Sequence, residues 1–304
     1  MKNVLVTGAA GFIGYKTALY FVNKGYQVCG WDLIDQVFSE GSFEINKINM
    51  LDEGDILKAL GNLNPEIIIH CAGSADVGKS VQYPEIDYEG NVTITHNLLF
   101  AMHKLGLENT RFVFLSSAGV YGNPQKLPIK ENASLNPLSP YAVHKVMCEE
   151  LCKYFASNYG MNIKVARIFS AYGAGLRKQI FWDMYQKYSK TGRLDMFGTG
   201  YESRDYIHVD DVIQSLYILA NTDSKEVLFN VANGEETTIL EATQLFADSV
   251  GCNHDCISFN GFVREGDPLN WRADISKIKG LGYKKTTDMK TGLEDYIEWT
   301  KKCN

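Results

Sequence analysis

The sequence predicts an α/β protein whose core is a doubly wound parallel sheet. Three observations predict it: apolar β-branched segments alternate with amphipathic ones, a glycine-rich turn joins the first strand to the first helix, and 45% of the 304 residues are hydrophobic. Strands that helices cover on both faces show such continuous apolar runs instead of an alternating pattern. A chain of this length can form one large α/β unit or two domains.

The first strand runs directly into a glycine-rich turn and a helix. Gly8 can take a left-handed backbone conformation, Gly11 lets the main chain approach a pyrophosphate, and Gly14 lets the helix lie close on the strand. Phe12 and Ile13 open that helix, whose free N–H groups and partial positive charge stabilise phosphate. Such turns also occur for steric reasons alone, so the prediction of a dinucleotide site depends on the second strand as well.

The second strand, residues 27–31, ends at Asp32, near the spacing at which an acidic residue binds the adenosine ribose hydroxyls. A carboxylate at this position repels a 2′-phosphate. Neither Arg nor Lys occurs between Asp32 and Glu44, and Asp35 adds negative charge. The predicted cofactor is therefore NAD and not NADP. The alternative is a solvated aspartate at a strand end.

The alternation of strands and helices continues along the chain. The expected strands are 2–7, 27–31, 66–73, 111–116, 165–169 and 227–231, and the expected later helices are 52–61, 91–105, 141–159, 179–190 and 209–221. Asn49, Met50 and Ala72 follow extended segments, and we assign them to the cofactor site because ligands of such sheets bind beyond the carboxyl ends of the strands.

Two domains are expected from this order of elements. The dinucleotide-binding domain would comprise residues 1–170 plus about 205–232, with residues 205–208 returning to the main sheet. A smaller C-terminal α/β substrate domain would comprise about 171–204 plus 233–304.

Composition argues against several classes of function. A net charge of −6 gives no reason to expect nucleic acid or an anionic membrane as a partner. No apolar run approaches membrane-spanning length, and the first strand begins at the N-terminus without room for a signal peptide, which favours the cytoplasm. The seven cysteines, including Cys148 with Cys152 and Cys252 with Cys256, lack the spacing of a zinc site, and we expect reduced thiols and no metal.

Three residues carry the expected chemistry. Tyr141 and Lys145 are four residues apart on one helix, so the phenol and the ammonium share a face. A free tyrosine has a pKa of about 10, and a nearby cation favours the phenolate, which can take a proton from a sugar hydroxyl. Ser117 lies at the end of the strand 111–116, where its hydroxyl would reach the same substrate oxygen. The spacing of Tyr141 and Lys145 is common on surface helices, so the prediction of a catalytic site depends on their combination with Ser117.

Several motifs recur together in one known family. They are the glycine turn, His-Cys-Ala-Gly at 70–73, Ser-Ser-Ala-Gly-Val-Tyr-Gly at 116–122, Tyr141 with Lys145, Arg-Asp-Tyr at 204–206 and Val-Asp-Asp-Val at 209–212. The chain resembles, from end to end, the extended short-chain dehydrogenase/reductase family, and within it the NAD-dependent nucleotide-sugar epimerases and dehydratases. The resemblance implies a Rossmann domain, bound NAD, a nucleoside-diphosphate sugar as substrate, and a catalytic triad of Ser117, Tyr141 and Lys145. It also implies a homodimer in which helices 91–105 and 141–159 of two subunits form a four-helix bundle.

Departures from the family pattern narrow the expected reaction. The family's dehydratases carry an Asp-Glu pair where this chain has Ala118 and Gly119, and the glutamate of the related decarboxylases and the cysteine of enzymes that epimerise beside the ketone are also missing. The reactions that remain for this chain are oxidation and reduction at one carbon of the substrate. Ser170 stands where the family has an Asn against the substrate diphosphate, and His144 stands where it has a Ser. His144 is expected to be a spectator at the helix surface, with a proton relay as the alternative.

Arg204 and Arg264 are the expected diphosphate ligands, because a guanidinium offers a rigid fork of donors that matches phosphate oxygens. Both match arginines that the resemblance places on the substrate diphosphate, and Asp267 matches a position that meets the nucleoside ribose. The alternative is that the two arginines pair at the surface with their neighbours Asp205 and Glu265.

Three functions remain open at this point. The first is an epimerase that acts at C4 of a nucleoside-diphosphohexose through a transient 4-keto intermediate and retains its NAD. The second is an NAD(P)-dependent 4-keto nucleotide-sugar reductase or dehydrogenase, whose residues could be identical. The third is a catalytically inactive, dinucleotide-responsive binding protein, against which the intact Ser117, Tyr141 and Lys145 argue. Asp32 and the turn after Ser117 favour the epimerase.

Overall fold

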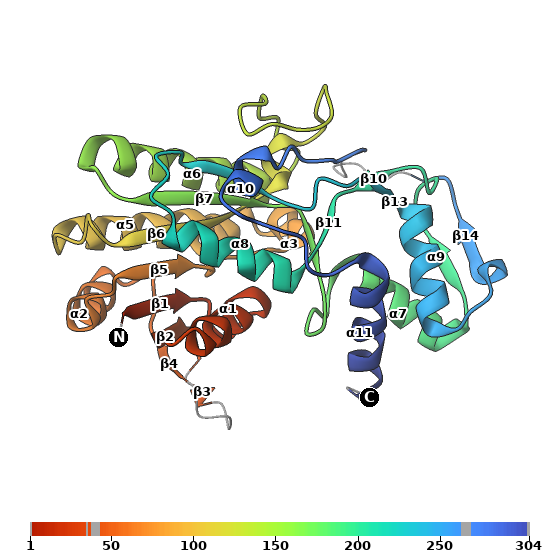
Figure 1. Cartoon of the computed structure of the whole chain (residues 1–304), viewed down its shortest axis with the longest axis horizontal. Helices are drawn as coiled ribbons and strands as arrows, with labels where there is room; N and C mark the ends of the chain where they lie inside the picture. The colour runs from red at the N-terminus through yellow and green to blue at the C-terminus, as the bar shows by residue number, and fades with distance from the viewer. Residues whose placement is uncertain (1, 35, 38–42, 263–268, 303–304) are drawn as a thin grey trace. The chain divides into compact units, whose positions relative to one another are not determined.

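The computed structural model describes residues 2–34, 36–37, 43–262 and 269–302, and it confirms the predicted fold class. Its centre is an eight-stranded sheet (Figure 1). The strands are, in spatial order, β12 (Leu228–Val231), β7 (Ile163–Ile168), β6 (Arg111–Ser117), β5 (Ile67–His70), β1 (Asn3–Thr7), β2 (Gln27–Asp32), β4 (Glu44–Lys47) and β3 (Gln36–Val37). The pairs of β1 with β2 and β5, of β2 with β4, and of β5 with β6 are parallel.

Two layers of helices flank this sheet. In one layer α2 (Glu53–Leu63), α5 (Ile94–Lys104) and α6 (Pro140–Tyr159) lie side by side (Figure 1). In the other, α1 (Phe12–Asn23) and α8 (Val209–Asn221) pack together through the ring of Tyr217, whose centroid lies 5.5 Å from those of Tyr20 and Phe21. Among the helices that the structure describes, none combines the length and the apolar character that crossing a membrane requires.

The central strands are apolar because both of their faces are covered. Val4, Leu5 and Val6 of β1 are fully buried, as are Ile68 and Ile69 of β5. Leu5 stands opposite Ile68 in the parallel register. Burying one such side chain stabilises the fold by about 1.5–3 kcal/mol relative to leaving it exposed. Strands in the middle of the sheet need apolar side chains on both faces, and this need explains the continuous apolar runs from which the strands are predicted.

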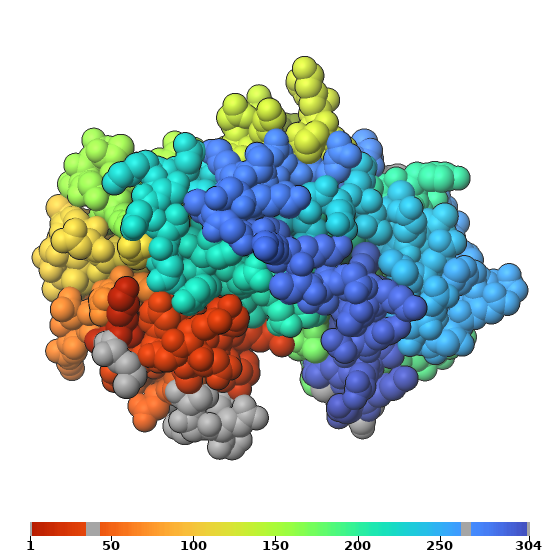
Figure 2. All heavy atoms as spheres, viewed as in Figure 1, coloured from red at the N-terminus to blue at the C-terminus, as the bar shows by residue number. Residues whose placement is uncertain are grey.

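The chain divides into two compact units. Unit 1 comprises Met1–Val120, Pro137–Arg167 and Ile213–Phe229, and unit 2 comprises Tyr121–Asn136, Ile168–Val212 and Asn230–Asn304. Unit 2 thus includes the loop that follows β6, which is yellow-green in Figure 2.

Unit 2 is built from two-stranded sheets and helices around a core of its own. The strand pairs are β8 (Ser170–Tyr172) with β11 (Tyr206–His208), β9 (Leu194–Met196) with β14 (Ile257–Phe259), and β10 (Ser203–Arg204) with β13 (Thr237–Thr238). Its helices include α7 (Gln179–Thr191), α9 (Ile239–Val250), α10 (Ser276–Gly280) and α11 (Met289–Lys302). A cluster of buried rings, among them Phe181, Phe246 and Tyr296, holds these elements together.

Two local features differ from the predictions. The sequence predicts that residues 205–208 return to the main sheet, but β11 pairs in parallel with β8 of unit 2, with Ile207 opposite Ala171. Both strands are three residues long, so their apolar pattern does not select a partner. The first three residues of the predicted helix 91–105 belong to a π-helical turn, Glu89–Thr93, and α5 begins after it at Ile94.

A buried ion pair fixes α6 against the sheet. Glu149 of α6 accepts hydrogen bonds from Nε and Nη2 of Arg167 on β7, at 2.8 and 2.6 Å, and from Oγ of Ser116 on β6 at 2.6 Å. The side chains of Glu149 and Arg167 are 0% and 1% exposed. A bidentate pair is tolerated in such an interior because each charge compensates the other, whereas either charge alone is costly.

Glu149→Gln should lower the free energy of unfolding by about 3–5 kcal/mol, because the Arg167 charge then stays buried without its carboxylate. Replacing both partners by apolar residues, Glu149→Leu with Arg167→Met, should recover most of that loss. Urea unfolding followed by tryptophan fluorescence measures both variants. Glu150→Gln, at an exposed position of the same helix, is the control. A single variant as stable as this control would show that the ion pair does not fix the helix.

Candidate functional site

The glycine turn lies between β1 and α1, at the carboxyl end of a central strand. Gly8 has a φ of 65°, and a Cβ there would meet the backbone N of Ala72 at 2.7 Å. A Cβ on Gly14 would overlap the carbonyl oxygen of Gly8. Gly11 is the N-cap of α1 and has no side-chain cap bond, so the first N–H groups of the helix face outward for an anion. The turn therefore fits a dinucleotide pyrophosphate.

Asp32 is held at this turn. Its Oδ2 accepts a hydrogen bond from the N–H of Ala10 at 2.9 Å, and its Oδ1 accepts one from the N–H of Leu33 at 2.8 Å. Two backbone donors thus orient the carboxylate. A freely solvated aspartate would lack these two hydrogen bonds. Its place at the end of β2 and beside the glycine turn fits the adenosine ribose of a dinucleotide.

The other predicted cofactor residues also lie in unit 1, near the same ends of the strands. Asn49 and Met50 follow β4; Asn49 is exposed and Met50 is buried. Ala72 follows β5. Phe12 and Ile13 form the first turn of α1, where both are half-buried.

Ser117 and Tyr141 both border Gly119. Ser117 is the last residue of β6, and its Oγ accepts a hydrogen bond from the N–H of Gly119 at 3.1 Å. A Cβ built on Gly119 would lie 3.3 Å from Oγ of Ser117 and 4.0 Å from Cε1 of Tyr141. The hydroxyl and the phenol ring therefore border the same point, which the missing side chain of Gly119 leaves open.

Lys145 lies one turn after Tyr141 on α6. Its Nζ is 5.8 Å from the centre of the Tyr141 ring and donates a hydrogen bond to the carbonyl of Leu115 at 3.0 Å, and the residue is 6% exposed. Burial and, as a smaller cause, the charge of Lys145 together lower the pKa of His70 to about 3. His70 is therefore neutral at pH 7, whereas Lys145 is the cation of this part of the interior.

The start of α6 fixes the backbone of Tyr141. Ser139 caps the helix by accepting a hydrogen bond from the N–H of Ala142 at 3.3 Å, and Pro140 occupies the first turn. The N–H of Tyr141, which has no partner inside the helix, donates to Oγ of Ser80 on α3 (Val77–Gln82) at 3.1 Å. No motif marks Ser80, which lies 61 positions from Tyr141 in the chain.

The prediction that His144 is a surface residue is wrong. Its side chain is 10% exposed, and its Nδ1 lies 2.6 Å from Oδ2 of Asp87 on α4 (Pro84–Tyr88). The imidazole also meets the ring of Tyr88 edge to face, with centroids 5.5 Å apart. The partner Asp87 is itself 2% exposed. Sequence spacing gave no signal for this contact, because the two residues are 57 positions apart.

Of the predicted substrate residues, Ser170 and Arg204 lie in unit 2, whereas Ser117 lies in unit 1. Ser170 is the first residue of β8, and its N–H donates to the carbonyl of Asp205 at 3.1 Å. The predictions for Arg264 and Asp267 fall outside the described residues.

Arg204 does not form the surface pair with Asp205 that the alternative interpretation expects. Its guanidinium lies over the ring of Trp271, with Cζ 5.7 Å from the ring centre, and its Nη1 donates to the carbonyl of Ser203 at 2.8 Å. Asp205 is fully buried and accepts three backbone N–H bonds at 2.9–3.0 Å. Burial raises the pKa of Asp205 to about 7 in spite of these donors. Trp271 is a further residue that the sequence analysis missed.

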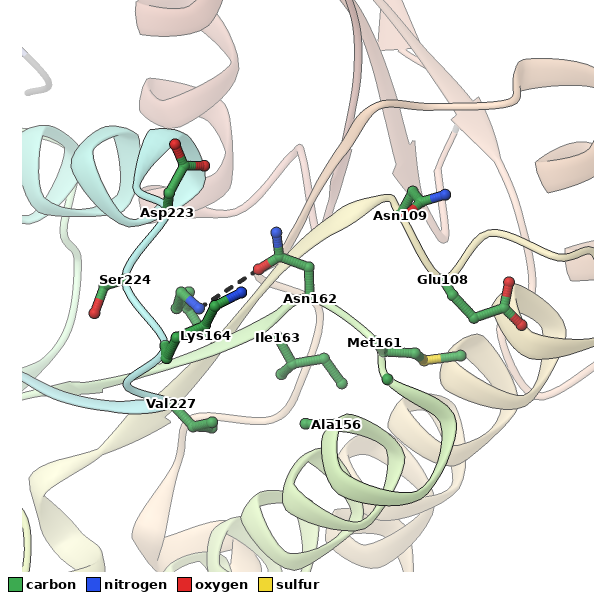
Figure 3. Close-up of a pocket in the computed structure, with 12 residues that line it drawn as sticks. Glu108, Asn109, Ala156, Met161, Asn162, Ile163, Lys164, Asp223, Ser224 and Val227 are labelled. Carbon is green, nitrogen blue, oxygen red and sulfur yellow. Dashed lines mark hydrogen bonds between the residues drawn. The ribbon is translucent and has the colours of Figure 1, made fainter.

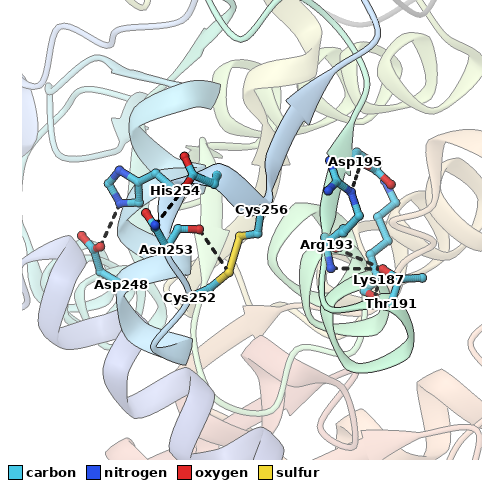
Figure 4. The surroundings of a disulfide bond; sticks show 10 residues. Lys187, Thr191, Arg193, Asp195, Asp248, Cys252, Asn253, His254 and Cys256 are labelled. Atoms are coloured by element: carbon cyan, nitrogen blue, oxygen red, sulfur yellow. Dashed lines mark hydrogen bonds and ion pairs between the residues drawn. A yellow bond between two sulfur atoms is a disulfide. The ribbon is translucent and has the colours of Figure 1, made fainter.

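The cysteines form two groups. Cys148 and Cys152 are buried free thiols, as predicted, and burial raises the pKa of Cys152 well above its usual value. In unit 2 a disulfide joins Cys252 to Cys256 (Figure 4), so the prediction of free thiols is wrong there. The short helical turn His254–Cys256 after α9 brings their Cα atoms to 6.8 Å. Within the described ranges, no three His, Cys, Asp or Glu side chains are placed to share a metal ion.

A cavity of about 530 Å³ lies elsewhere in unit 1 (Figure 3). Its lining includes Asn109 and Asn162, which precede β6 and β7, and Lys164, whose Nζ reaches Oδ1 of Asn162 at 3.5 Å. Ser117 and the predicted cofactor residues lie at the opposite, carboxyl ends of the strands. The cavity is therefore separate from the predicted chemistry.

Comparison with known proteins places this geometry in a family. The model of a family described as "NAD dependent epimerase/dehydratase family" matches residues 4–232. A putative UDP-glucose 4-epimerase of Methanocaldococcus jannaschii is 31% identical and aligns over 99% of each chain. Among solved structures, MoeE5 in complex with UDP-glucose and NAD has 28% identity and a TM-score of 0.87, with 99% of each chain covered. The UDP-glucose 4-epimerase of Thermotoga maritima with UDP-glucose has 26% identity and a TM-score of 0.89, also over 99% of each chain. As its motifs predict, the chain belongs to the NAD-dependent epimerase/dehydratase family.

Proposed function

We propose that this protein is an NAD-dependent nucleotide-sugar epimerase that inverts C4 of a UDP-hexose through a transient 4-keto intermediate. The proposal rests on one observation: Ser117 Oγ and the Tyr141 ring both border the open position at Gly119, and Lys145 lies one turn further along α6. Relatives that are named UDP-glucose 4-epimerases and match this chain over nearly its whole length support the same reaction.

Unit 1 is the proposed NAD-binding domain. The backbone at Gly8, Gly11 and Gly14 and the open N–H groups of α1 suit the pyrophosphate, and the oriented carboxylate of Asp32 suits the adenosine ribose. The same carboxylate repels a 2′-phosphate, which favours NAD over NADP. When bound, NAD supplies the acceptor and donor of hydride for the sugar carbon.

Residues of the chain itself handle the proton in this proposal. Tyr141 acts as the base that takes the proton of the sugar 4-hydroxyl, and Ser117 donates a hydrogen bond to the same oxygen as it becomes a ketone oxygen. The ammonium of Lys145, 5.8 Å from the phenol ring and shielded from solvent, stabilises negative charge on Tyr141. Return of the proton from Tyr141 to the sugar leaves the protein unchanged after each turnover.

The turn after Ser117 favours epimerisation over elimination. Ala118 and Gly119 begin a short 3₁₀ turn, Ala118–Tyr121, and neither carries a group that can protonate a departing hydroxyl. With no acid at these two positions, the keto sugar is left to take hydride back at C4. The open point at Gly119 also leaves room for the hexose to turn over and present its second face.

Unit 2 is the proposed nucleotide-sugar domain. Arg204 is held between the Trp271 ring and the carbonyl of Ser203, which limits its rotamers and preorganises a cation for the diphosphate. We propose Ser170, Arg264 and Asp267 as further contacts to the nucleotide. An anchored diphosphate allows the hexose to rotate without leaving the protein, which an epimerase requires and a simple reductase does not.

We also propose that the protein is a homodimer through α5 and α6. Val143, Met147 and Tyr154 form an apolar stripe on α6, with successive spacings of four and seven residues, and they are 36%, 43% and 51% exposed. This stripe belongs to a helix that packs against α5 within unit 1. A second copy would cover the two helices and bury the stripe, which supports a four-helix bundle.

The cytoplasm is the compartment we propose. Cys29, Cys71, Cys148 and Cys152 are free thiols, in contrast to the disulfide-bonded Cys252 and Cys256, and free thiols persist in reducing compartments. Burial raises the pKa of Cys71 to about 12, so this thiol beside the glycine turn does not ionise at neutral pH.

Tyr141→Phe should lower kcat by about 10²- to 10⁴-fold, because the substitution removes the proton-transfer group and keeps the ring. The KM for UDP-hexose and the amount of bound NAD should change little. Tyr201→Phe, at an exposed position, is the matched control and should keep wild-type turnover. The rate of C4 epimer formation by NMR measures both variants. Wild-type turnover in Tyr141→Phe would exclude this residue as the base.

Asp32→Ala should weaken NAD binding by about 10- to 100-fold, the equivalent of its charge-assisted hydrogen bonds, and should bring NADP closer to NAD in affinity. Asp32→Asn keeps an acceptor for the N–H of Ala10 and removes the charge, so it should relax the discrimination with a smaller loss of NAD affinity. Fluorescence titration with both dinucleotides measures these effects. An unchanged preference in both variants would place Asp32 outside the adenosine site.

The purified protein should interconvert the C4 epimers of a UDP-hexose without added cofactor. We would incubate it with a panel of UDP-hexoses in deuterated buffer and follow C4 by NMR, with the Tyr141→Phe protein as the control. Epimer that carries no deuterium at carbon is expected, because the hydride returns to the carbon that lost it. Ketone reduction in proportion to added NADH or NADPH, with no epimer, would assign the protein to the reductases instead.

A further inference from the structure

A chain of buried hydrogen bonds crosses the interior of unit 1. It begins at Thr7, directly before the glycine turn. Oγ1 of Thr7 lies 2.7 Å from Nδ1 of His70. Nε2 of His70 lies 3.1 Å from Oγ1 of Thr95, and Thr95 donates to the carbonyl of Asn91 at 2.7 Å. The side-chain amide of Asn91 in turn donates to the carbonyl of Asp87 at 3.0 Å. The chain thereby connects β1, β5, α5 and the π-helical turn to α4.

His144 closes this chain on the helix that carries the proposed base. Its Nδ1 lies 2.6 Å from Oδ2 of Asp87. The second carboxylate oxygen of Asp87 is buried and has no hydrogen-bond partner in the part of the chain that the structure describes. The imidazole is therefore the group that compensates this carboxylate. The serine of the family pattern has a short hydroxyl in place of the ring.

The pair holds two parts of the site in register. Asp87 lies two residues before the π-helical turn, and His144 directly precedes Lys145 on α6. A Cβ on Gly73 would lie 2.7 Å from Oδ1 of Asn91, which the π-helical turn carries, and 3.4 Å from Nζ of Lys145. The amide and the ammonium thus flank one point, and the contact of Asp87 with His144 ties their two elements together.

Removing the imidazole would leave a buried carboxylate without its partner. A buried polar group without a partner is costly, and the simplest relief is a movement of α4 and the π-helical turn toward water. Because proton transfer requires its groups to be held within a fraction of an ångström, even a small shift of Lys145 relative to Tyr141 would slow the reaction.

We propose that His144 and Asp87 are a positioning pair for the epimerase reaction. They hold the π-helical turn against α6, so that Lys145 stays in place beside Tyr141. The proposal rests on the proposed function, because it assigns the pair a part in that reaction. His144 acts through Lys145 and touches neither the sugar nor the cofactor.

His144→Leu should lower kcat by about 10²-fold and leave the KM for UDP-hexose nearly unchanged, because the position of Lys145 is disturbed while Arg204 is not. His144→Asn, whose amide takes the place of the Nδ1 donor to Asp87, should recover most of the rate. Asp87→Asn should resemble His144→Leu, and the double variant should be no slower than either single one, since each removes the same interaction.

His254→Leu is the control. It breaks the exposed pair of His254 with Asp248 in unit 2, with Nε2 and Oδ1 2.9 Å apart (Figure 4), and should keep wild-type kcat. All rates are taken well below the melting transition of each variant. Wild-type kcat in folded His144→Leu, or a loss that His144→Asn does not recover, would overturn the positioning role.

A second measurement separates this proposal from the proposed function. Reduction of bound NAD by cyanoborohydride requires no sugar, and its rate depends on the charge placed near the nicotinamide. His144→Leu should slow this reduction several-fold and His144→Asn should restore it. If the wild-type protein binds NAD but forms no epimer, the proposed function fails. The positioning pair is then supported by this pattern of reduction rates and overturned by equal rates in all three proteins.

Discussion

The register of α6 against the sheet is the constraint on which the site depends. Glu149 binds β6 through Ser116 and β7 through Arg167, in an interior where an unpaired charge would be costly. Tyr141 lies about two helical turns earlier on the same helix. The bidentate geometry of the pair sets both the rotation of the helix and its height on the sheet. The proposed base and its lysine therefore take their positions from the core, and not from a loop.

Burial and the charge of Lys145 set the protonation states of the side chains at the ends of the strands. His70 and Cys71, the two neighbours of Lys145, remain neutral at pH 7, since burial lowers the pKa of the first and raises that of the second. The field of the ammonium is thus not cancelled by these side chains. A positive field in this place suits both a phenolate and a bound dinucleotide.

The structural features that the sequence predicts correctly are those that depend on residues close together in the chain. The central strands follow from unbroken apolar runs, the turn follows from the backbone freedom of Gly8, and the shared face of Tyr141 and Lys145 follows from helical spacing. Ser80 and Asp87 reach the same helix from 61 and 57 positions away, and no local pattern marks such contacts. The pairing of β11 with β8 was missed for a related reason, because short strands pair by tertiary packing and not by their own pattern.

Gly119 has a consequence for how such proteins diverge. A side chain at this position would start 3.3 Å from Oγ of Ser117, so its functional group would lie beside the proposed proton-transfer residues. The dehydratases that the sequence resembles carry an acid at this point. Two proteins with the same sheet, the same helix and the same proposed triad could therefore release different products because of the side chains at two adjacent positions, Ala118 and Gly119 in this chain.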